Sequence, residues 1–75
     1  MNSARRARLS RIIEDINAAV SKLGDTRDEE QAYLDEMPEN FQDSNNAEVS
    51  REAIEAMEVV IDGINGGIST LEELL

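Results

Sequence analysis

Acidic side chains are the residues of this chain best suited to chemistry. They cluster as Asp28-Glu29-Glu30, Asp35-Glu36 and Glu72-Glu73, and neighbouring carboxylates can hold a divalent cation or act as general acid and base. The clusters lack the EF-hand spacing with its glycine and terminal glutamate. Acid–base work would need a cleft, which a chain of 75 residues rarely forms. We therefore interpret the clusters as solvated helix faces and predict no metal site.

Other kinds of catalysis lack the residues they need. The chain has no Cys and no His, so disulfides, thiolate or imidazole zinc sites and Ser–His or Cys–His nucleophiles are excluded. Gly63, Gly66 and Gly67 do not form a dinucleotide-binding loop, because no strand precedes them. The sequence predicts a protein that is not an enzyme and needs no cofactor.

Two groups of residues remain as candidates for binding. Arg5, Arg6 and Arg8 oppose the dipole of the helix that they begin, so we expect an acidic helix end beside them or, alternatively, a phosphate-bearing ligand. The only aromatic residues, Tyr33 and Phe41, are expected to plug the end of a hairpin or, alternatively, to stack a base or dock a peptide. The candidate ligand- or partner-binding residues are Arg5, Arg6, Arg8, Tyr33, Asn40, Phe41 and Gln42.

The charge of the chain limits its partners. Seven Lys and Arg against seventeen Asp and Glu give a net charge of −10. An acidic body repels duplex nucleic acid and anionic membranes, and it attracts basic surfaces. No stretch approaches the ~20 apolar residues of a membrane span, and Glu14 and Asp15 interrupt any secretory signal.

Apolar spacing predicts the elements of the first half. Steps of three and four residues join Leu9, Ile12, Ile13, Ile16, Ala19, Val20 and Leu23, which predicts an amphipathic helix over residues 3–23 that ends at Gly24. Thr26 and Glu29 are spaced as a capping box, which predicts a short helix over residues 27–36. Pro38 then favours a connector over residues 37–46.

The second half predicts one long helix over residues 47–75. Two lines with seven-residue spacing run through it, Ile54-Ile61-Ile68-Leu75 and Met57-Ile64-Leu71, with Ala53-Val60-Gly67-Leu74 beside them. Three glycines at 63, 66 and 67 each cost about 1 kcal/mol in a helix. Because the apolar lines cross them unbroken, we expect a continuous helix with a close-packed or bent spot.

Together these elements predict a single all-α domain, a helical hairpin completed by oligomerisation. Each long helix carries a stripe too broad for one partner, so a dimer or higher homo-oligomer forming a bundle is expected. The predicted oligomer core is Leu9, Ile12, Ile13, Ile16, Ile54, Met57, Ile61, Ile64, Ile68 and Leu71. We expect the long helices to run antiparallel, with the arginines near Glu72 and Glu73; a parallel arrangement in a three-helix bundle is the alternative.

Residues 26 to 75 resemble a group of small helical proteins encoded by phages and prophage-bearing bacteria. The resemblance is most specific around Met37-Pro38-Glu39-Asn40, within the segment that runs from Glu29 to Ser44. It implies a phage or prophage origin and a cytoplasmic place in a bacterial host cell. It does not include the arginine cluster.

Three functions fit these observations. The preferred one is a counter-defence inhibitor that binds a host protein through its acidic surface. The second is an oligomeric sponge that sequesters a nucleotide second messenger with arginines and Tyr33 at a subunit junction. The third is a structural or regulatory assembly protein.

Overall fold

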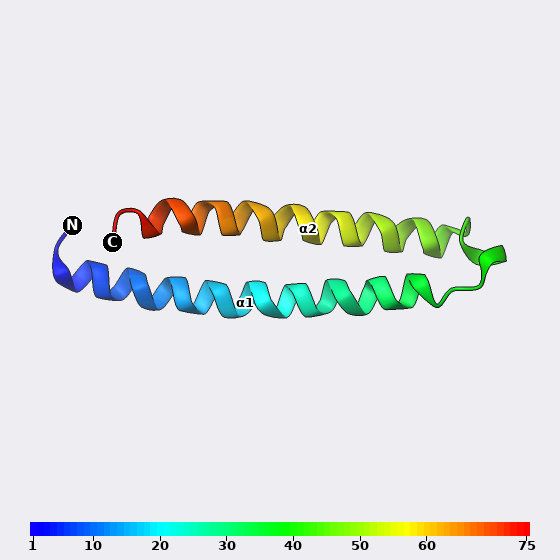
Figure 1. Cartoon of the computed structure of the whole chain (residues 1–75), viewed down its shortest axis with the longest axis horizontal. Helices are drawn as coiled ribbons and strands as arrows, with labels where there is room; N and C mark the ends of the chain where they lie inside the picture. The colour runs from blue at the N-terminus through cyan, green and yellow to red at the C-terminus, as the bar shows by residue number, and fades with distance from the viewer.

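The computed structural model describes all 75 residues as two long antiparallel helices joined by a compact turn (Figure 1). Helix α1 spans Ser3–Asp35, the short 3-10 helix η1 spans Glu39–Phe41, and α2 spans Asn45–Glu72. The two chain ends lie at the same end of a rod that measures 59 × 15 × 13 Å. The predicted all-α hairpin is confirmed, and its long helices run antiparallel.

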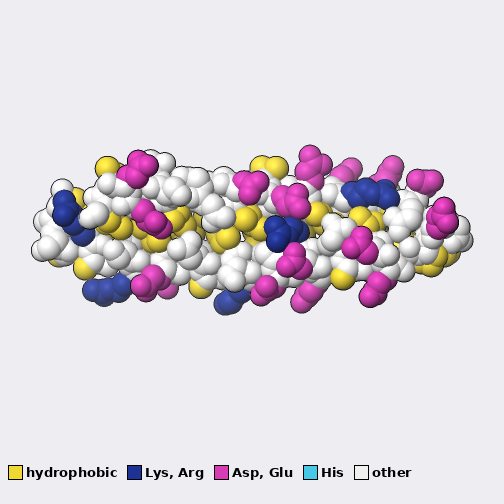
Figure 2. Space-filling view, viewed as in Figure 1, with side chains coloured by type: hydrophobic (Ala, Val, Ile, Leu, Met, Phe, Trp, Pro, Cys, Tyr) yellow, Lys and Arg dark blue, Asp and Glu magenta, His cyan; other side chains and the backbone are white.

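One seam holds the two helices together. Most buried and half-buried residues follow alternating steps of four and three, the spacing of a coiled-coil seam. Figure 2 shows hydrophobic side chains along this seam and charged side chains on both helices beside it. The seam consists of Leu9, Ile13, Ile16, Val20, Leu23, Arg27, Glu30 and Leu34 of α1 and Met37 just beyond it, with Ala47, Ser50, Ile54, Met57, Ile61, Ile64, Ile68 and Leu71 of α2.

The seam is polar at one level. Ser50 is 1% exposed, and its hydroxyl donates a hydrogen bond to the carboxylate of Glu30. Beside this contact Leu34, Ala47 and Ile54 form a small apolar cluster. A polar group inside an apolar seam is stabilised in one alignment only, so this contact sets the register of the helices.

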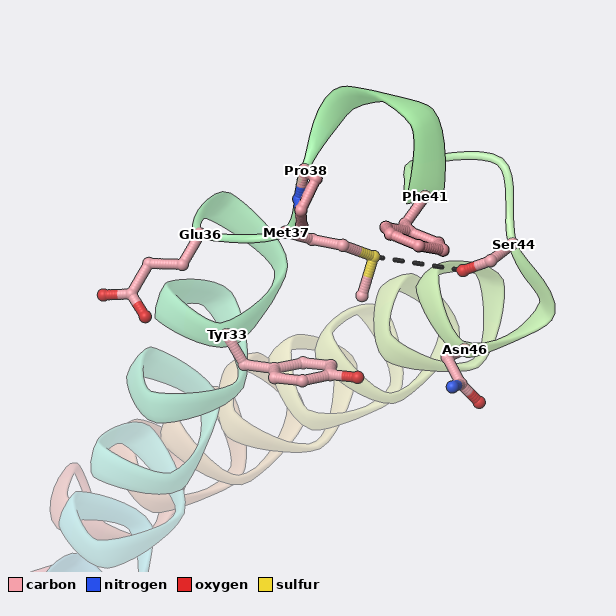
Figure 3. A pocket seen from close by; sticks show the side chains of 7 residues that line it. All are labelled: Tyr33, Glu36, Met37, Pro38, Phe41, Ser44 and Asn46. Carbon is pink, nitrogen blue, oxygen red and sulfur yellow. Dashed lines mark hydrogen bonds between the residues drawn. The ribbon is translucent and has the colours of Figure 1, made fainter.

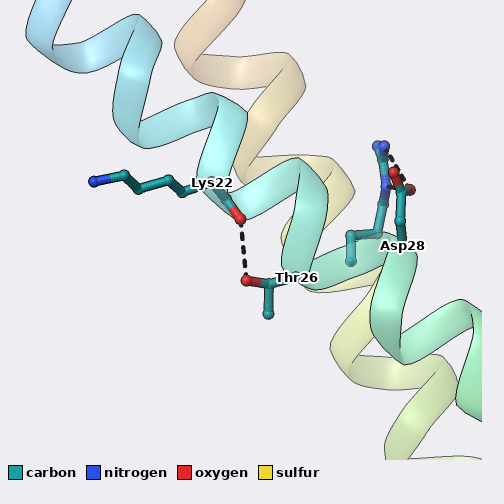
Figure 4. Close-up of polar contacts among 4 residues, drawn as sticks. Lys22, Thr26 and Asp28 are labelled. Atoms are coloured by element: carbon teal, nitrogen blue, oxygen red, sulfur yellow. Dashed lines mark hydrogen bonds and ion pairs between the residues drawn. The ribbon is translucent and has the colours of Figure 1, made fainter.

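Helix α1 is longer than the sequence predicted. The predicted end at Gly24 and the separate helix over residues 27–36 are wrong, because one helix runs through both. Thr26 is not a cap: its hydroxyl donates to the carbonyl of Lys22 at 3.0 Å, in the manner of a residue inside a helix (Figure 4). Seam residues continue on both sides of Gly24, and packing against α2 overrides its low helix propensity.

Helix α2 begins two residues before the predicted start and ends at Glu72 rather than at residue 75. The hydroxyl of Ser44 accepts a hydrogen bond from the backbone N–H of Ala47 at 3.2 Å and caps its first turn. The predicted continuity through the three glycines is confirmed. Close packing there is not found within the chain, because a Cβ added at Gly63, Gly66 or Gly67 would meet nothing within 4 Å.

The predicted oligomer core divides into two groups. Ile13, Ile54, Ile61 and Ile68 are buried inside the single hairpin, and Leu9, Ile16, Met57, Ile64 and Leu71 are half-buried there. Ile12 is 44% exposed and lies outside the seam. Most residues that were expected to join two chains therefore join the two helices of one chain. Ile12 does neither within the single hairpin.

The arginines do not pair with the C-terminal acids of the same chain. The structure holds one ion pair, between Arg27 and Asp28 at 3.1 Å (Figure 4). The start of α1 is capped by the Asn2 side chain, which accepts from the backbone N–H of Arg5 at 2.8 Å. The antiparallel helices bring the arginines and these two acids to the same end of the rod, as expected, but no ion pair joins them within the single chain. Neither helix is long and apolar enough to cross a membrane.

A charge placed in the seam tests its contribution to stability. Ile61→Asp should lower the free energy of unfolding by about 3 kcal/mol or more, because it buries an unpaired carboxylate. Glu58→Gln, at an exposed position one turn away, should change it by less than about 0.5 kcal/mol. Urea denaturation followed by circular dichroism measures both, and equal effects would contradict the seam.

The continuity of α1 has its own test. Gly24→Ala should raise the free energy of unfolding by about 0.5–1 kcal/mol, because Gly24 lies inside a helix. The added methyl group has room, since its nearest neighbour would be the Nη2 atom of Arg27 at 3.9 Å. A loss of stability in urea denaturation would instead favour a helix end at this glycine.

Candidate functional site: a turn-end pocket and an uncharged face

Gln42 builds the turn that joins the helices. Its side-chain amide donates to the backbone carbonyls of Leu34 at 3.0 Å and Met37 at 2.9 Å. The Leu34 carbonyl, in the last turn of α1, also accepts from the backbone N–H of Met37 at 3.2 Å. The Met37 carbonyl, two residues beyond α1, accepts from no backbone N–H, so the Gln42 amide supplies its donor. Arg51 of α2 in turn donates to the Gln42 carbonyl at 2.7 Å and to its side-chain oxygen at 3.2 Å. The end of α1, the turn and the start of α2 are thereby tied together.

This turn holds open a pocket of about 430 Å³ (Figure 3). Tyr33 and Phe41 present their rings to it and are 50% and 52% exposed. The Met37 side chain lies between them, and its sulfur accepts a hydrogen bond from the Ser44 hydroxyl at 3.9 Å. The Glu36 carboxylate stands at the rim and points away from the rings. The pocket is lined by Tyr33, Glu36, Met37, Pro38, Phe41, Ser44 and Asn46.

The structure separates the predicted binding residues. Tyr33 and Phe41 share the pocket, whereas Asn40 is exposed on η1 and does not line it. Gln42 holds the turn through its hydrogen bonds. Arg5, Arg6 and Arg8 lie at the other end of the rod, so a single chain does not combine them with the aromatic rings.

The prediction that the aromatic rings plug the hairpin holds only in part. Both rings lie at its end, yet each keeps about half of its surface exposed. Sequence reasoning missed the other five pocket residues, which are Glu36, Met37, Pro38, Ser44 and Asn46. One signal was present, because Tyr33 and Met37 are four residues apart and therefore neighbours on a helix. The contribution of Ser44 and Asn46 depends on the turn geometry, which the spacing does not reveal.

A second feature is an uncharged face along one side of the hairpin. Tyr33 and Asn46 each precede a buried seam residue by one position, and both line the pocket. The positions that lie whole heptads from Tyr33 along α1 and from Asn46 along α2 are therefore on this same side of the coiled coil. Apart from Arg5, which begins the α1 line, these positions carry no charge. We call the following residues the uncharged face: Ile12, Ala19, Thr26 and Tyr33 of α1, with Ala53, Val60 and Gly67 of α2 and Leu74 just beyond its end.

The α2 half of this face continues outward without a charge. Val49, Ala56, Gly63 and Thr70 lie beside it on the same helix, and they too are exposed. Together with the four α2 residues of the uncharged face they repeat the steps of four and three found in the buried seam. Helix α2 thus carries, outside the hairpin, a second line of uncharged residues with the spacing of a coiled-coil seam.

No group of three or more acidic side chains lies close enough to hold a metal ion. No buried side-chain nitrogen or oxygen lacks a hydrogen-bond partner. What the surface offers is contact: two aromatic rings in a pocket and an apolar face.

Comparison with known protein families, curated proteins and solved structures found no match. The resemblance of residues 26 to 75 to small phage-encoded proteins therefore stays a prediction, and the function has to be argued from the geometry. That geometry favours binding between helices.

Removing the Gln42 side chain tests how the turn is held. Gln42→Ala should lower the free energy of unfolding by about 1–2 kcal/mol, because the Met37 carbonyl loses its donor and the Leu34 carbonyl loses one of its two donors. Gln31→Ala is the matched control, since its amide only reaches the exposed Asp35 side chain at 2.9 Å. Thermal unfolding compares the two, and equal stabilities would contradict the role of Gln42.

Proposed function

We propose that this chain is a non-enzymatic binding protein that works as an oligomer, with two hairpins packed through their uncharged faces into a four-helix bundle. The uncovered second seam of α2 supports this most directly. Coiled-coil seams of this spacing are filled by a facing helix. Monomeric proteins rarely leave an extended apolar surface in water.

The surface area of the chain supports the same proposal. It exposes 5542 Å², whereas a compact monomer of 8.3 kDa is expected to expose about 4,600 Å². The excess is close to the ~800 Å² that each partner buries in a protein interface of standard size. Only seven of the 75 residues are buried, so a second copy would also supply the core that a short chain lacks.

A dimer built this way would keep most of its acidic side chains outward. Acids such as Glu48, Glu55, Glu58 and Asp62 lie away from the uncharged face. With a net charge of −10 per chain, the bundle would attract a basic protein surface. We extend the proposal to such a partner, and a counter-defence role is one setting for it if the chain has the phage origin that the resemblance implies.

Solution mass tests the oligomer. Light scattering at micromolar concentration should give at least twice 8.3 kDa. Val60→Asp should return the protein to its monomer mass, because it places a carboxylate on the uncharged face. Val60 is 46% exposed in the hairpin, so the helices themselves should stay folded by circular dichroism.

The control for this test is Asn65→Asp. It adds the same charge to α2 at an exposed position off the uncharged face, and it should leave the mass of the oligomer unchanged. A wild-type protein that stays at 8.3 kDa up to the highest soluble concentration would contradict the proposed function.

A further inference from the structure

The charge along α1 alternates beside the uncharged face. Arg8, Asp15, Lys22 and Glu29 occupy the line next to Ile12, Ala19 and Thr26, and all four are exposed. From Arg8 to Glu29 the charges are positive, negative, positive and negative, and from Glu29 to Arg8 each sign is the opposite. A second α1 running in the opposite direction would therefore meet an opposite charge at each position, with Arg8 facing Glu29 and Asp15 facing Lys22.

The α1 line of the uncharged face has the same symmetry once Arg5, one heptad before Ile12, is included. Arg5, Ile12, Ala19, Thr26 and Tyr33 lie seven residues apart on α1, with Ala19 in the middle. An antiparallel second copy centred on Ala19 sets Arg5 of each chain opposite Tyr33 of the other. Such a contact repeats twice about a twofold axis, as an isologous interface requires.

We infer that a second copy of this chain packs antiparallel on the uncharged face, with the two α1 helices paired about a twofold axis at Ala19 and Arg5 of each copy at the turn-end pocket of the other. This inference rests on the oligomer proposed above. It adds the orientation of the two hairpins and the side chain that completes the pocket.

The glycines of α2 fit this arrangement. Leu34 packs with Ala47 and Ile54, and two heptads further the same antiparallel register sets Val20 between Ile61 and Ile68. Ala19 is then level with the middle of residues 63 to 67, so the twofold axis also passes this segment. The space above Gly63, Gly66 and Gly67, which is open in the single hairpin, would be filled by α2 of the second copy. Glycine lets two helix backbones approach closely.

The pocket is suited to an arginine. The rings of Tyr33 and Phe41 can each accept a guanidinium on a face. Residues 28 to 43 carry seven acids and no base, whereas residues 1 to 13 carry four arginines and no acid. An antiparallel pair places the basic end of each hairpin on the acidic end of the other. A parallel pair would set the two acidic ends against each other, which costs binding energy.

A charge swap inside α1 tests the orientation. Sedimentation equilibrium should show that Asp15→Lys raises the dimer Kd about tenfold or more, because Lys faces Lys twice across the twofold axis. The double variant Asp15→Lys with Lys22→Asp restores opposite charges and should return the Kd to within about threefold of the wild type. Glu14→Lys makes the same charge change one residue away, off the interface, and should match the wild type more closely than Asp15→Lys does.

The pocket is tested by Tyr33, the only tyrosine in a chain without tryptophan. Its fluorescence should change as the dimer forms, and Arg5→Glu should remove most of that change and weaken the dimer. Arg11→Glu, with the same change in charge but off the interface, should remove neither.

The outcomes separate the two proposals. A wild-type protein that is monomeric overturns both. A stable dimer in which Asp15→Lys behaves like Glu14→Lys, or in which the double variant shows no recovery, overturns the antiparallel arrangement and leaves the oligomer standing. A dimer that depends on Asp15 but not on Arg5 overturns the assignment of Arg5 to the pocket.

Discussion

The burial of apolar seams is the constraint on which this structure depends. A helix that carries one seam needs one partner, and α1 is that partner for α2. The buried line from Ala47 to Ile68 is filled from within the chain. The parallel line through Val60 and Gly67 has no partner in a hairpin of two helices, because nothing else in the chain can reach it. The fold follows because α1 covers the first seam of α2. The proposed association follows because the second seam of α2 has no partner within the chain.

The turn and the polar level decide where the seams lie. The Glu30–Ser50 hydrogen bond accepts one alignment of the helices, and the Gln42 contacts fix the end of α1 against the start of α2. Through that alignment the turn brings Tyr33 and Asn46 to one side of the hairpin. The same alignment places Ala19 level with the glycine segment. If α1 slipped by one heptad along α2, Tyr33 would no longer lie beside Asn46, and Ala19 would no longer be level with the glycines. The local contacts at the turn therefore decide which residues share a face along the whole rod.

Much of the fold could be predicted from the sequence, because seven-residue spacing is a strong signal over long helices. The hairpin, the antiparallel direction and the continuity of α2 through its glycines could be predicted in this way. The break at Gly24 and the cap at Thr26 were wrong, since local signals compete with packing that the sequence does not display. The seam continues through Arg27 and Glu30. Because these two residues are charged, the apolar spacing of α1 is interrupted after Leu23.

The candidate site was harder to predict. The aromatic pair was identified, but its pocket depends on a turn that Gln42 and Arg51 assemble across nine residues. The alternating charges from Arg8 to Glu29 are visible in the sequence. These charges form one line only if a single helix carries all four residues. The predicted helix end at Gly24 placed Glu29 in a separate helix, so the line was not recognised.

Small-angle X-ray scattering tests the central claim most directly, because it measures mass and length together. A second hairpin packed antiparallel along the whole of α1 doubles the mass of 8.3 kDa while the longest dimension stays near the 59 Å of one hairpin. That combination is the predicted result. A single-chain mass with the radius of gyration of the isolated rod, near 17.2 Å, would contradict the account.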